Sequence, residues 1–256
     1  MNLLTIDIGN TRSHWAFFEK KKLVARGAES SRDEECEFTH LFTPEDQRLT
    51  PDAVIASSVV PRLNTPLSQQ ASDSGLRCEF LTWENTGPLR LHHPHPEGVG
   101  TDRFASALGA ISHYAPPLVV VDMGTAVTVD AVTAKNGFEG GCIAPGLSML
   151  SEYLSERISL LPKIDLSTDQ NLSGIGRSTL EATEIGCKIG FTGMVRELIS
   201  TVSEEIQSID GKAPQVVLTG GSFPLISKGW LGQFPYFPDL AHEGLRTLGD
   251  FLLQSS

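Results

Sequence analysis

Several features are scarce in this sequence, and each absence narrows the possible functions. No apolar run approaches the ~18 residues of a membrane-spanning helix, and we expect neither a membrane segment nor a secretory signal. The cysteines are far apart and form no Cys-x-x-Cys pair, which favours reduced, buried thiols and a cytoplasmic protein. They are Cys36, Cys78, Cys142 and Cys187.

Positive charge is scarce as well. The chain has 20 Lys and Arg against 31 Asp and Glu, a formal net charge of −11. Nucleic-acid affinity depends largely on cationic side chains that release counterions, so we expect no nucleic-acid partner. A phosphate ligand would need local positive potential from bound cations and backbone N–H groups.

Common nucleotide-binding and hydrolase signatures are also absent. There is no GxxxxGK[ST], no HRD or DFG pair and no GxSxG, and Gly98-Val99-Gly100 does not continue as a Rossmann fingerprint. The loop with His92, His93 and His95 is rich in proline. It could bind a transition metal, but no further Cys or His pattern supports this, and a structural loop is favoured.

The chain contains two similar segments. Residues 3–11 and 119–126 both read as a buried strand that ends in Asp-x-Gly and leads into a second and a third strand. Their aspartates, Asp7 and Asp122, lie about half a chain length apart. We interpret this as a duplication that gives two α/β lobes, each opening with a β-meander, with lobes at 1–115 and 116–256.

Helical spacing of apolar residues predicts four main helices. The third contains Gly186, Gly190 and Gly193, which indicate close helix packing or a break between two helices. A strand at 216–219 leads into Gly220. Residues 61–96 give only a weak pattern. The predicted helices cover residues 101–114, 147–161, 178–209 and 240–253.

The first Asp-x-Gly turn has the chemistry of a phosphate site. A carboxylate at the end of a buried strand is costly unless it meets a cation, which makes Asp7 a candidate metal contact. Gly9 allows a close backbone approach, and the N–H groups of such a turn can surround phosphate oxygens. Arg12 could reach a phosphate. A single copy would favour an ordinary hairpin, but two copies can face each other across a cleft.

Two further glycine segments follow strands in the second half. Each reads equally well as a tight turn or as a ligand contact. Glycine backbone would let a nucleoside lie flat against it, so Gly220 and Gly221 are candidate nucleoside contacts. The other segment runs from Gly140 to Gly146.

Gly100-Thr101-Asp102-Arg103 opens a predicted helix. Thr101 or Asp102 could be a helix cap, and Arg103 is unexpected there because a cation opposes the helix dipole. Asp102 could accept a proton from a substrate hydroxyl, and Arg103 could fix an anionic or polar part of that substrate.

These motifs together resemble the type III pantothenate kinases, which belong to the actin, sugar-kinase and Hsp70 ATPase superfamily. The resemblance covers nearly the whole chain and rests on the order of five motifs. It implies duplicated ribonuclease H-like lobes, each a mixed β-sheet with flanking helices. The motifs are Asp7 to Thr11, Gly100 to Arg103, Asp122 to Asp130, Gly140 to Gly146, and Ser178-Thr179.

The resemblance also implies roles. Asp102 would be the base for the pantothenate hydroxyl, Asp7 would help to hold Mg²⁺, and Asp122 would bind a monovalent cation, K⁺ or NH₄⁺. The family forms homodimers, so Thr179 would serve the partner's substrate site. The phosphates of ATP would contact Ile8, Gly9, Asn10, Thr11, Arg12 and Thr125, and pantothenate would contact Gly100, Thr101, Arg103 and Thr179. His93 stands near a position where the family often has a Tyr, as a further substrate contact.

Three functions are therefore carried forward. The first is ATP-dependent phosphorylation of pantothenate, the first step of coenzyme A biosynthesis. The second is a weak or inactive relative that acts as a regulatory accessory factor. The third is a kinase of the same superfamily that acts on a sugar or a short acid, although Gly-Thr-Asp-Arg is not the signature of sugar kinases.

Overall fold

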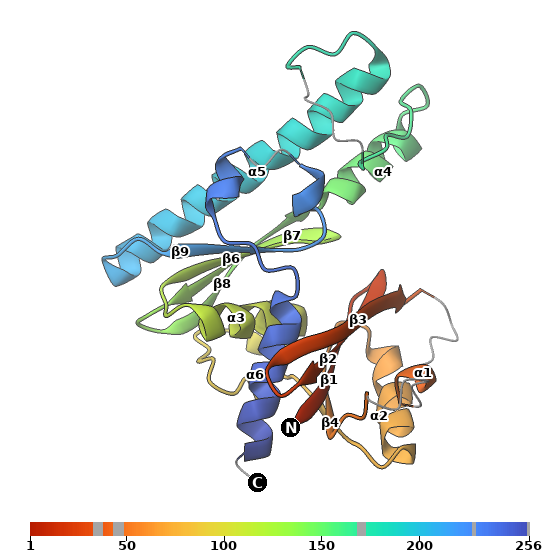
Figure 1. Cartoon of the computed structure of the whole chain (residues 1–256). Helices are drawn as coiled ribbons and strands as arrows, with labels where there is room; N and C mark the ends of the chain where they lie inside the picture. The colour runs from red at the N-terminus through yellow and green to blue at the C-terminus, as the bar shows by residue number, and fades with distance from the viewer. Residues whose placement is uncertain (33–37, 43–48, 168–172, 227–228, 255–256) are drawn as a thin grey trace. The chain divides into compact units, whose positions relative to one another are not determined.

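The structure, a computed structural model, describes residues 1–32, 38–42, 49–167, 173–226 and 229–254 (Figure 1). The chain forms two compact units: Met1–Tyr114 together with Asp239–Ser256, and Ala115–Pro238. The first boundary lies next to the predicted one at 115. The predicted lobes are wrong for the C-terminal segment: we expected it in the second lobe, and it belongs to the first unit.

A mixed five-stranded sheet forms the centre of the first unit. Strands β1 to β3 make an antiparallel meander, and β4 and β5 add parallel to β1. The spatial order is β3 (Lys22–Ser30), β2 (Arg12–Glu19), β1 (Asn2–Ile8), β4 (Ala53–Ser58) and β5 (Arg77–Phe80).

Helices cover both faces of this sheet. Leu4, Ile6 and Ile8 of β1 pack in one hydrophobic cluster with residues of α1 (Thr39–Phe42) and α2 (Asn64–Asp73). Because side chains alternate along a strand, Leu3, Thr5 and Asp7 point to the opposite face. That face is covered by α3 (Thr101–His113) and α6 (Leu240–Gln254). Two short 3-10 turns, η1 (Pro61–Leu63) and η2 (Pro96–Gly98), join these elements.

The packing of α6 on α3 explains why the C-terminal segment belongs to the first unit. A Cβ added to Gly109 of α3 would lie 2.1 Å from the Leu240 carbonyl oxygen, and one added to Gly244 of α6 would lie 1.9 Å from that of Ala105. The two helix backbones therefore touch where they cross. This contact is non-local, so helical periodicity alone could not reveal it.

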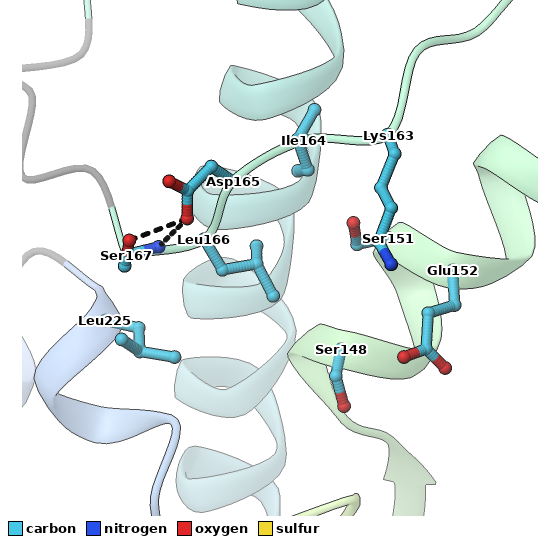
Figure 2. A pocket seen from close by; sticks show the side chains of 9 residues that line it. All are labelled: Ser148, Ser151, Glu152, Lys163, Ile164, Asp165, Leu166, Ser167 and Leu225. Carbon is cyan, nitrogen blue, oxygen red and sulfur yellow. Dashed lines mark hydrogen bonds between the residues drawn. The ribbon is translucent and has the colours of Figure 1, made fainter.

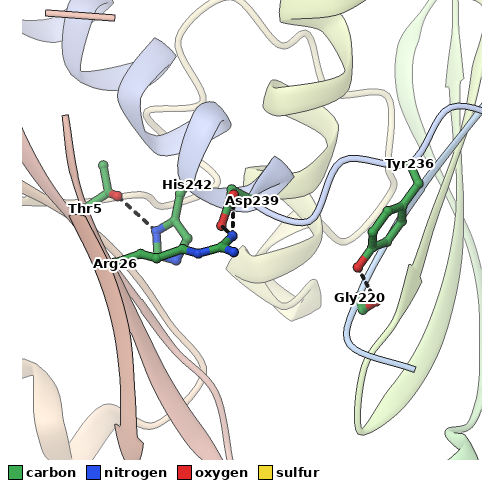
Figure 3. Close-up of polar contacts among 6 residues, drawn as sticks. All are labelled: Thr5, Arg26, Gly220, Tyr236, Asp239 and His242. Atoms are coloured by element: carbon green, nitrogen blue, oxygen red, sulfur yellow. Dashed lines mark hydrogen bonds and ion pairs between the residues drawn. The ribbon is translucent and has the colours of Figure 1, made fainter. Parts of the chain in front are cut away.

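Polar contacts also hold α6 on the sheet (Figure 3). The Thr5 hydroxyl donates to the Ala16 carbonyl (3.1 Å) and lies 2.9 Å from His242 Nδ1. Since that hydroxyl has a single proton, Nδ1 must be the donor to Thr5. Burial lowers the pKa of His242 to about 4, so the ring is neutral at neutral pH. Asp239, just before α6, pairs with Arg26 of β3 at 2.6 Å.

The second unit repeats the strand arrangement of the first. Its order is β8 (Gly137–Pro145), β7 (Ala126–Thr133), β6 (Leu118–Met123) and β9 (Gln215–Thr219). Strands β6 to β8 form an antiparallel meander and β9 is parallel to β6, as β4 is to β1. The predicted duplication is therefore confirmed at the level of topology.

Helix α5 (Thr179–Asp210) packs on this sheet with buried Phe191, Val195 and Ile199 (Figure 1). It is one continuous helix, and a Cβ at Gly186, Gly190 or Gly193 would meet nothing within 4 Å. Neither a break nor close packing against the described residues explains these glycines. The remaining helical elements of the unit are α4 (Leu147–Arg157), η3 (Phe223–Leu225) and η4 (Trp230–Gln233).

The expected ranges of the other main helices agree with the structure, except that α4 ends at Arg157 rather than residue 161. Over the described part of the chain, no helix is long and apolar enough to cross a membrane. Cys187 is buried, whereas Cys78 and Cys142 are half-buried, and all three are free thiols. Cys36 lies outside the described residues.

Candidate functional site

In the first unit, the candidate site lies where β1 and β4 end and α3 begins. Asp7 stands opposite Ser57 in the parallel register of β1 and β4. The buried Ser57 hydroxyl donates a hydrogen bond to Asp7 Oδ1. The Thr101 hydroxyl accepts from the Ser58 N–H (3.0 Å) and donates to the Ser58 carbonyl (3.1 Å). The start of α3 is thus fastened to the end of β4.

Asp102 lies in the first turn of α3, and Gly100 occupies the N-cap position. Neither Thr101 nor Asp102 is therefore the cap residue. Asp102 Oδ1 accepts the Arg103 N–H at 2.9 Å. A Cβ on Gly100 would lie 2.5 Å from the same oxygen, so a side chain at position 100 would displace the carboxylate. The closeness of the Asp102 carboxylate therefore explains why this motif has a glycine at position 100.

The two carboxylates of the first unit influence each other. Burial raises the pKa of Asp7 to about 6, the Ser57 hydrogen bond opposes this, and the charge of Asp102 raises it further. Burial also raises the pKa of Asp102, whereas the N–H and charge of Arg103 lower it. The structure therefore brings Asp7 and Asp102 close enough to interact electrostatically. A cation beside them would relieve both burial and repulsion.

The Asp-x-Gly turn between β1 and β2 closes on itself. The Gly9 N–H donates to the Arg12 carbonyl at 3.1 Å, and a Cβ on Gly9 would lie 3.0 Å from that oxygen. Asn10 and Arg12 are exposed, and the Thr11 carbonyl accepts the Ser31 N–H at 3.2 Å. Ile8 is buried. The predicted phosphate-binding residues of the first unit, Ile8 to Arg12, thus form one tight, partly exposed hairpin turn.

The second unit has a corresponding arrangement at the ends of β6 and β9. Asp122 stands opposite Thr219 in parallel register. Gly220 follows with φ +95°, a conformation that side chains with a Cβ rarely adopt. A Cβ there would lie 2.4 Å from the Met123 backbone and 2.6 Å from Asp122 Oδ1. Gly220 therefore packs directly against the Asp122 turn.

Two contacts fix the neighbouring turns of this unit. The Gly146 N–H donates to the Thr125 carbonyl at 3.0 Å, and a Cβ on Gly146 would lie 2.1 Å from that oxygen. The Tyr236 hydroxyl donates to the Gly220 carbonyl at 3.1 Å (Figure 3). A Cβ added to Gly221 would meet no atom within 4 Å, so its neighbours leave room for a side chain there. Strands β6, β8 and β9 run in the same direction, so the three glycine-containing turns that follow them lie at the same end of the strands.

Two predicted substrate contacts belong to other segments of the chain. Thr179 is exposed at the first position of α5 and lines a hollow of about 650 Å³ with Ser178 and Thr183. His93 is half-buried, and its Nδ1 accepts the His95 N–H at 3.2 Å. Each residue belongs to a different unit from the other.

Sequence reasoning missed other features. Ser57 is the direct partner of Asp7, and its only signal was the short apolar run of residues 53–56 ending in two serines. Tyr236 gave no signal. A second hollow of about 590 Å³ lies between α4, residues 163–167 and η3 (Figure 2). Its lining includes Ser151, Lys163 and Leu225.

The donor set of the first unit fits a magnesium ion that arrives with a nucleotide. Mg²⁺ prefers one or two carboxylates and otherwise keeps water and phosphate oxygens as ligands. Asp7 supplies such a carboxylate. Among the described residues, no group of three His, Cys, Asp or Glu side chains could hold a metal by itself. The predicted role of Asp7 thus needs the nucleotide to complete the coordination.

Solved structures with the same arrangement identify the class of fold. A ROK hexokinase from Thermus thermophilus matches all of both chains with a TM-score of 0.53 and 11% identity. A protein described as a Baf family transcriptional activator, from Campylobacter jejuni, matches 98% of this chain and 99% of its own, with a TM-score of 0.62 and 18% identity. The chain has the duplicated ribonuclease H-like fold of actin-like ATPases and sugar kinases.

The sequence narrows this class to one family. Residues 3–201 match the type III pantothenate kinases. A type III pantothenate kinase of Akkermansia muciniphila is 38% identical over 76% of this chain and 77% of its own. One of Desulfosudis oleivorans is 34% identical over 96% and 98%. The chain belongs to the type III pantothenate kinase family.

Proposed function

We propose residue roles for the reaction of this family in this chain. As a type III pantothenate kinase, the chain phosphorylates pantothenate to 4′-phosphopantothenate with ATP, the first step of coenzyme A biosynthesis. The observation that carries the residue roles is the pair of interacting carboxylates, Asp7 and Asp102, at the junction of β1, β4 and α3. In such a pair, one carboxylate can bind the metal while the other accepts the proton.

Asp102 is the general base of this proposal. Its carboxylate accepts the proton of the pantothenate hydroxyl as the oxygen attacks the γ-phosphorus, while the bond from the γ-phosphorus to the β,γ-bridging oxygen breaks and ADP leaves. Burial raises its pKa, which makes it a stronger base, while Arg103 keeps the charged form accessible. A hydrogen bond from the backbone N–H of Arg103 holds the Asp102 carboxylate in one orientation.

Asp7 and the adjacent turn receive the phosphates. Asp7 would hold Mg²⁺, which, when bound, neutralises charge on the transferring phosphoryl group. The Gly9 to Arg12 turn and Thr125 would contact phosphate oxygens. Because phosphoryl transfer asks little covalent chemistry of the protein, this positioning carries most of the rate.

Asp122 is the proposed ligand of a monovalent cation, K⁺ or NH₄⁺. Gly220 and Gly124 lie close to its carboxylate, because a Cβ added to them would lie 2.6 Å and 3.4 Å from Oδ1, respectively. Such a cation would offset negative charge in a protein of net charge −11. Gly220 and Gly221 would contact the nucleoside.

Pantothenate would lie beside Asp102. Arg103 supplies a cation for the carboxylate of pantothenate. Gly100, which has no side chain, leaves room for Asp102 to approach the pantothenate hydroxyl. The Thr101 hydroxyl already donates to Ser58, so Thr101 would contribute through its backbone or methyl group. His93 and Thr179 are the other proposed contacts.

No observation favours the alternative function, an inactive relative that acts as a regulator. The proposed catalytic and binding residues Asp7, Asp102, Arg103 and Asp122 are all present.

The reaction is tested with purified protein, ATP, Mg²⁺ and pantothenate. We expect mass spectrometry to detect pantothenate carrying one added phosphate. Turnover should be several-fold higher with K⁺ or NH₄⁺ than with Na⁺ at equal ionic strength, and chelation of Mg²⁺ should abolish it. The absence of product with every cation would refute the activity. Equal turnover with all monovalent ions would refute only the role of Asp122.

The partner of this chain is proposed to be a second copy. Helix α5 exposes Ile189, which is 50% exposed and shares a helix face with Gly186 and Gly193, three residues before it and four after it. The open positions of Gly186, Gly190 and Gly193 lie on the same helix and allow another backbone to approach. Thr179 begins this helix, which suits a role in the partner's substrate site.

A single charge on α5 should separate the dimer. The mass of one chain is 27.7 kDa, and we expect the wild-type protein to sediment at twice this value. Ile189→Glu should sediment as a monomer and lose most of its activity, because the substrate site would lack Thr179 of the partner. Val24→Glu, at an exposed apolar residue of β3, is the control and should remain dimeric. A monomeric wild-type protein would contradict the proposal.

A further inference from the structure

We infer that Ser57 is a positioning residue for Asp7: its hydroxyl holds Oδ1, so that Oδ2 is the oxygen left for the metal of the bound nucleotide. This inference rests on the proposed role of Asp7. It concerns a residue that no sequence motif marked.

The backbone fixes the relation of the two side chains. Strands β1 and β4 are parallel, and Asp7 and Ser57 stand opposite each other in their register. Opposite residues of neighbouring strands point to the same face of a sheet. Ser57 is 0% exposed, so surrounding atoms restrict its side chain. Its one hydroxyl proton goes to Asp7 Oδ1.

This hydrogen bond distinguishes the two carboxylate oxygens. Without it, the carboxylate could turn about its terminal bond and present either oxygen. Mg²⁺ requires nearly octahedral coordination at ~2.0–2.1 Å, so it tolerates little misplacement of a ligand. Groups that hydrogen-bond to a metal ligand orient it, and their loss typically weakens metal binding or activity by about 10–100-fold. Ser57 has the position of such a group.

The duplication supports a role tied to the carboxylate. In the second unit, the residue opposite Asp122 is Thr219, which is also buried and also carries a hydroxyl. Burying a hydroxyl is unfavourable unless it finds a partner. Alanine fills the buried positions Ala53 and Ala56 of the same strand as Ser57. A buried residue with a hydroxyl thus stands opposite the aspartate of the acidic turn in both units.

The test measures metal binding without turnover. Mn²⁺ replaces Mg²⁺, and electron paramagnetic resonance reports the free ion during titration of the protein–ADP complex. We expect Ser57→Ala to weaken Mn²⁺ binding by about tenfold or more. Ser57→Thr, which keeps the hydroxyl, should restore affinity to within a few-fold. Ser106→Ala is the control, because Ser106 is also buried in the same unit but its hydroxyl has no hydrogen-bond partner among the described residues.

The outcomes separate this inference from the proposed function. If Ser57→Ala binds Mn²⁺ as well as Ser106→Ala does, while Asp7→Asn is weakened, the role of Ser57 is refuted and that of Asp7 stands. If Asp7→Asn also binds normally, the proposed metal role of Asp7 is refuted. A folded Ser57→Thr that is as weak as Ser57→Ala would point to packing and overturn the inference. Should Ser57→Thr fail to fold, the comparison with Ser106→Ala decides.

Discussion

Asp102→Asn should lower kcat by about 10²–10⁴-fold while ATP still binds. The amide nearly matches the carboxylate in size but cannot accept the substrate proton, and a well-placed general base contributes an effect of this order. The proposed ATP contacts lie elsewhere, on the Asp7 turn and in the second unit. The loss should therefore fall on kcat rather than on the affinity for ATP.

Stability should not account for this loss. Burial raises the pKa of Asp102, which means that its charged form is disfavoured in the folded protein. Removing that charge should leave the free energy of unfolding unchanged or slightly higher. Asp73→Asn, an exposed carboxylate of α2 in the same unit, is the matched control and should keep wild-type kcat. If Asp102→Asn keeps more than a tenth of the wild-type kcat, Asp102 is not the base.

Gly220→Ala should destabilise the second unit and weaken ATP binding by at least tenfold. At φ +95° a Cβ is strained by about 1–2 kcal/mol. The added carbon would also lie 2.4 Å from the Met123 backbone, and such overpacking costs about 1–3 kcal/mol. Relief requires the end of β6 to shift, and Asp122 would move with it. Stability and nucleotide binding should therefore decline together.

The neighbouring glycine provides the control for this variant. Gly221 has no positive φ, and a Cβ there would meet nothing within 4 Å. Gly221→Ala should change the free energy of unfolding by less than about 1 kcal/mol. Urea unfolding compares the two variants, whereas calorimetric titration with ATP compares Gly220→Ala with the wild type, because Gly221 is itself a proposed nucleoside contact. If Gly220→Ala is as stable as Gly221→Ala and binds ATP as the wild type does, the close approach of Gly220 to the Asp122 turn does not matter in solution.

Local pattern was sufficient for much of the architecture. Two Asp-x-Gly segments, each between buried strands, predicted two repeated meanders, and the sheet orders β3-β2-β1-β4 and β8-β7-β6-β9 confirm them. Long helices were predictable because their apolar residues recur at helical spacing. The region 61–96 was harder, because its elements α2 and β5 are short and strand periodicity is weak over a few residues.

Contacts between distant segments were not accessible in the same way. Asp7 was readable as an acidic strand end, but its pairing with Ser57 depends on the register of β1 with β4, which no local pattern specifies. The glycines of α5 predicted a break or close packing, and the structure shows an unbroken helix with these positions open.

Residue chemistry and periodicity along the chain were thus enough to predict the repeated lobes and the acidic turns, because each of these depends on neighbours in sequence. The resemblance of five motifs, in their order, indicated the family. The membership of α6 in the first unit, the partner of Asp7 and the seating of Gly220 against Asp122 came only from the folded chain. Those features arise from steric and hydrogen-bonding contacts between segments 50 or more residues apart, and such contacts exist only after the chain has packed.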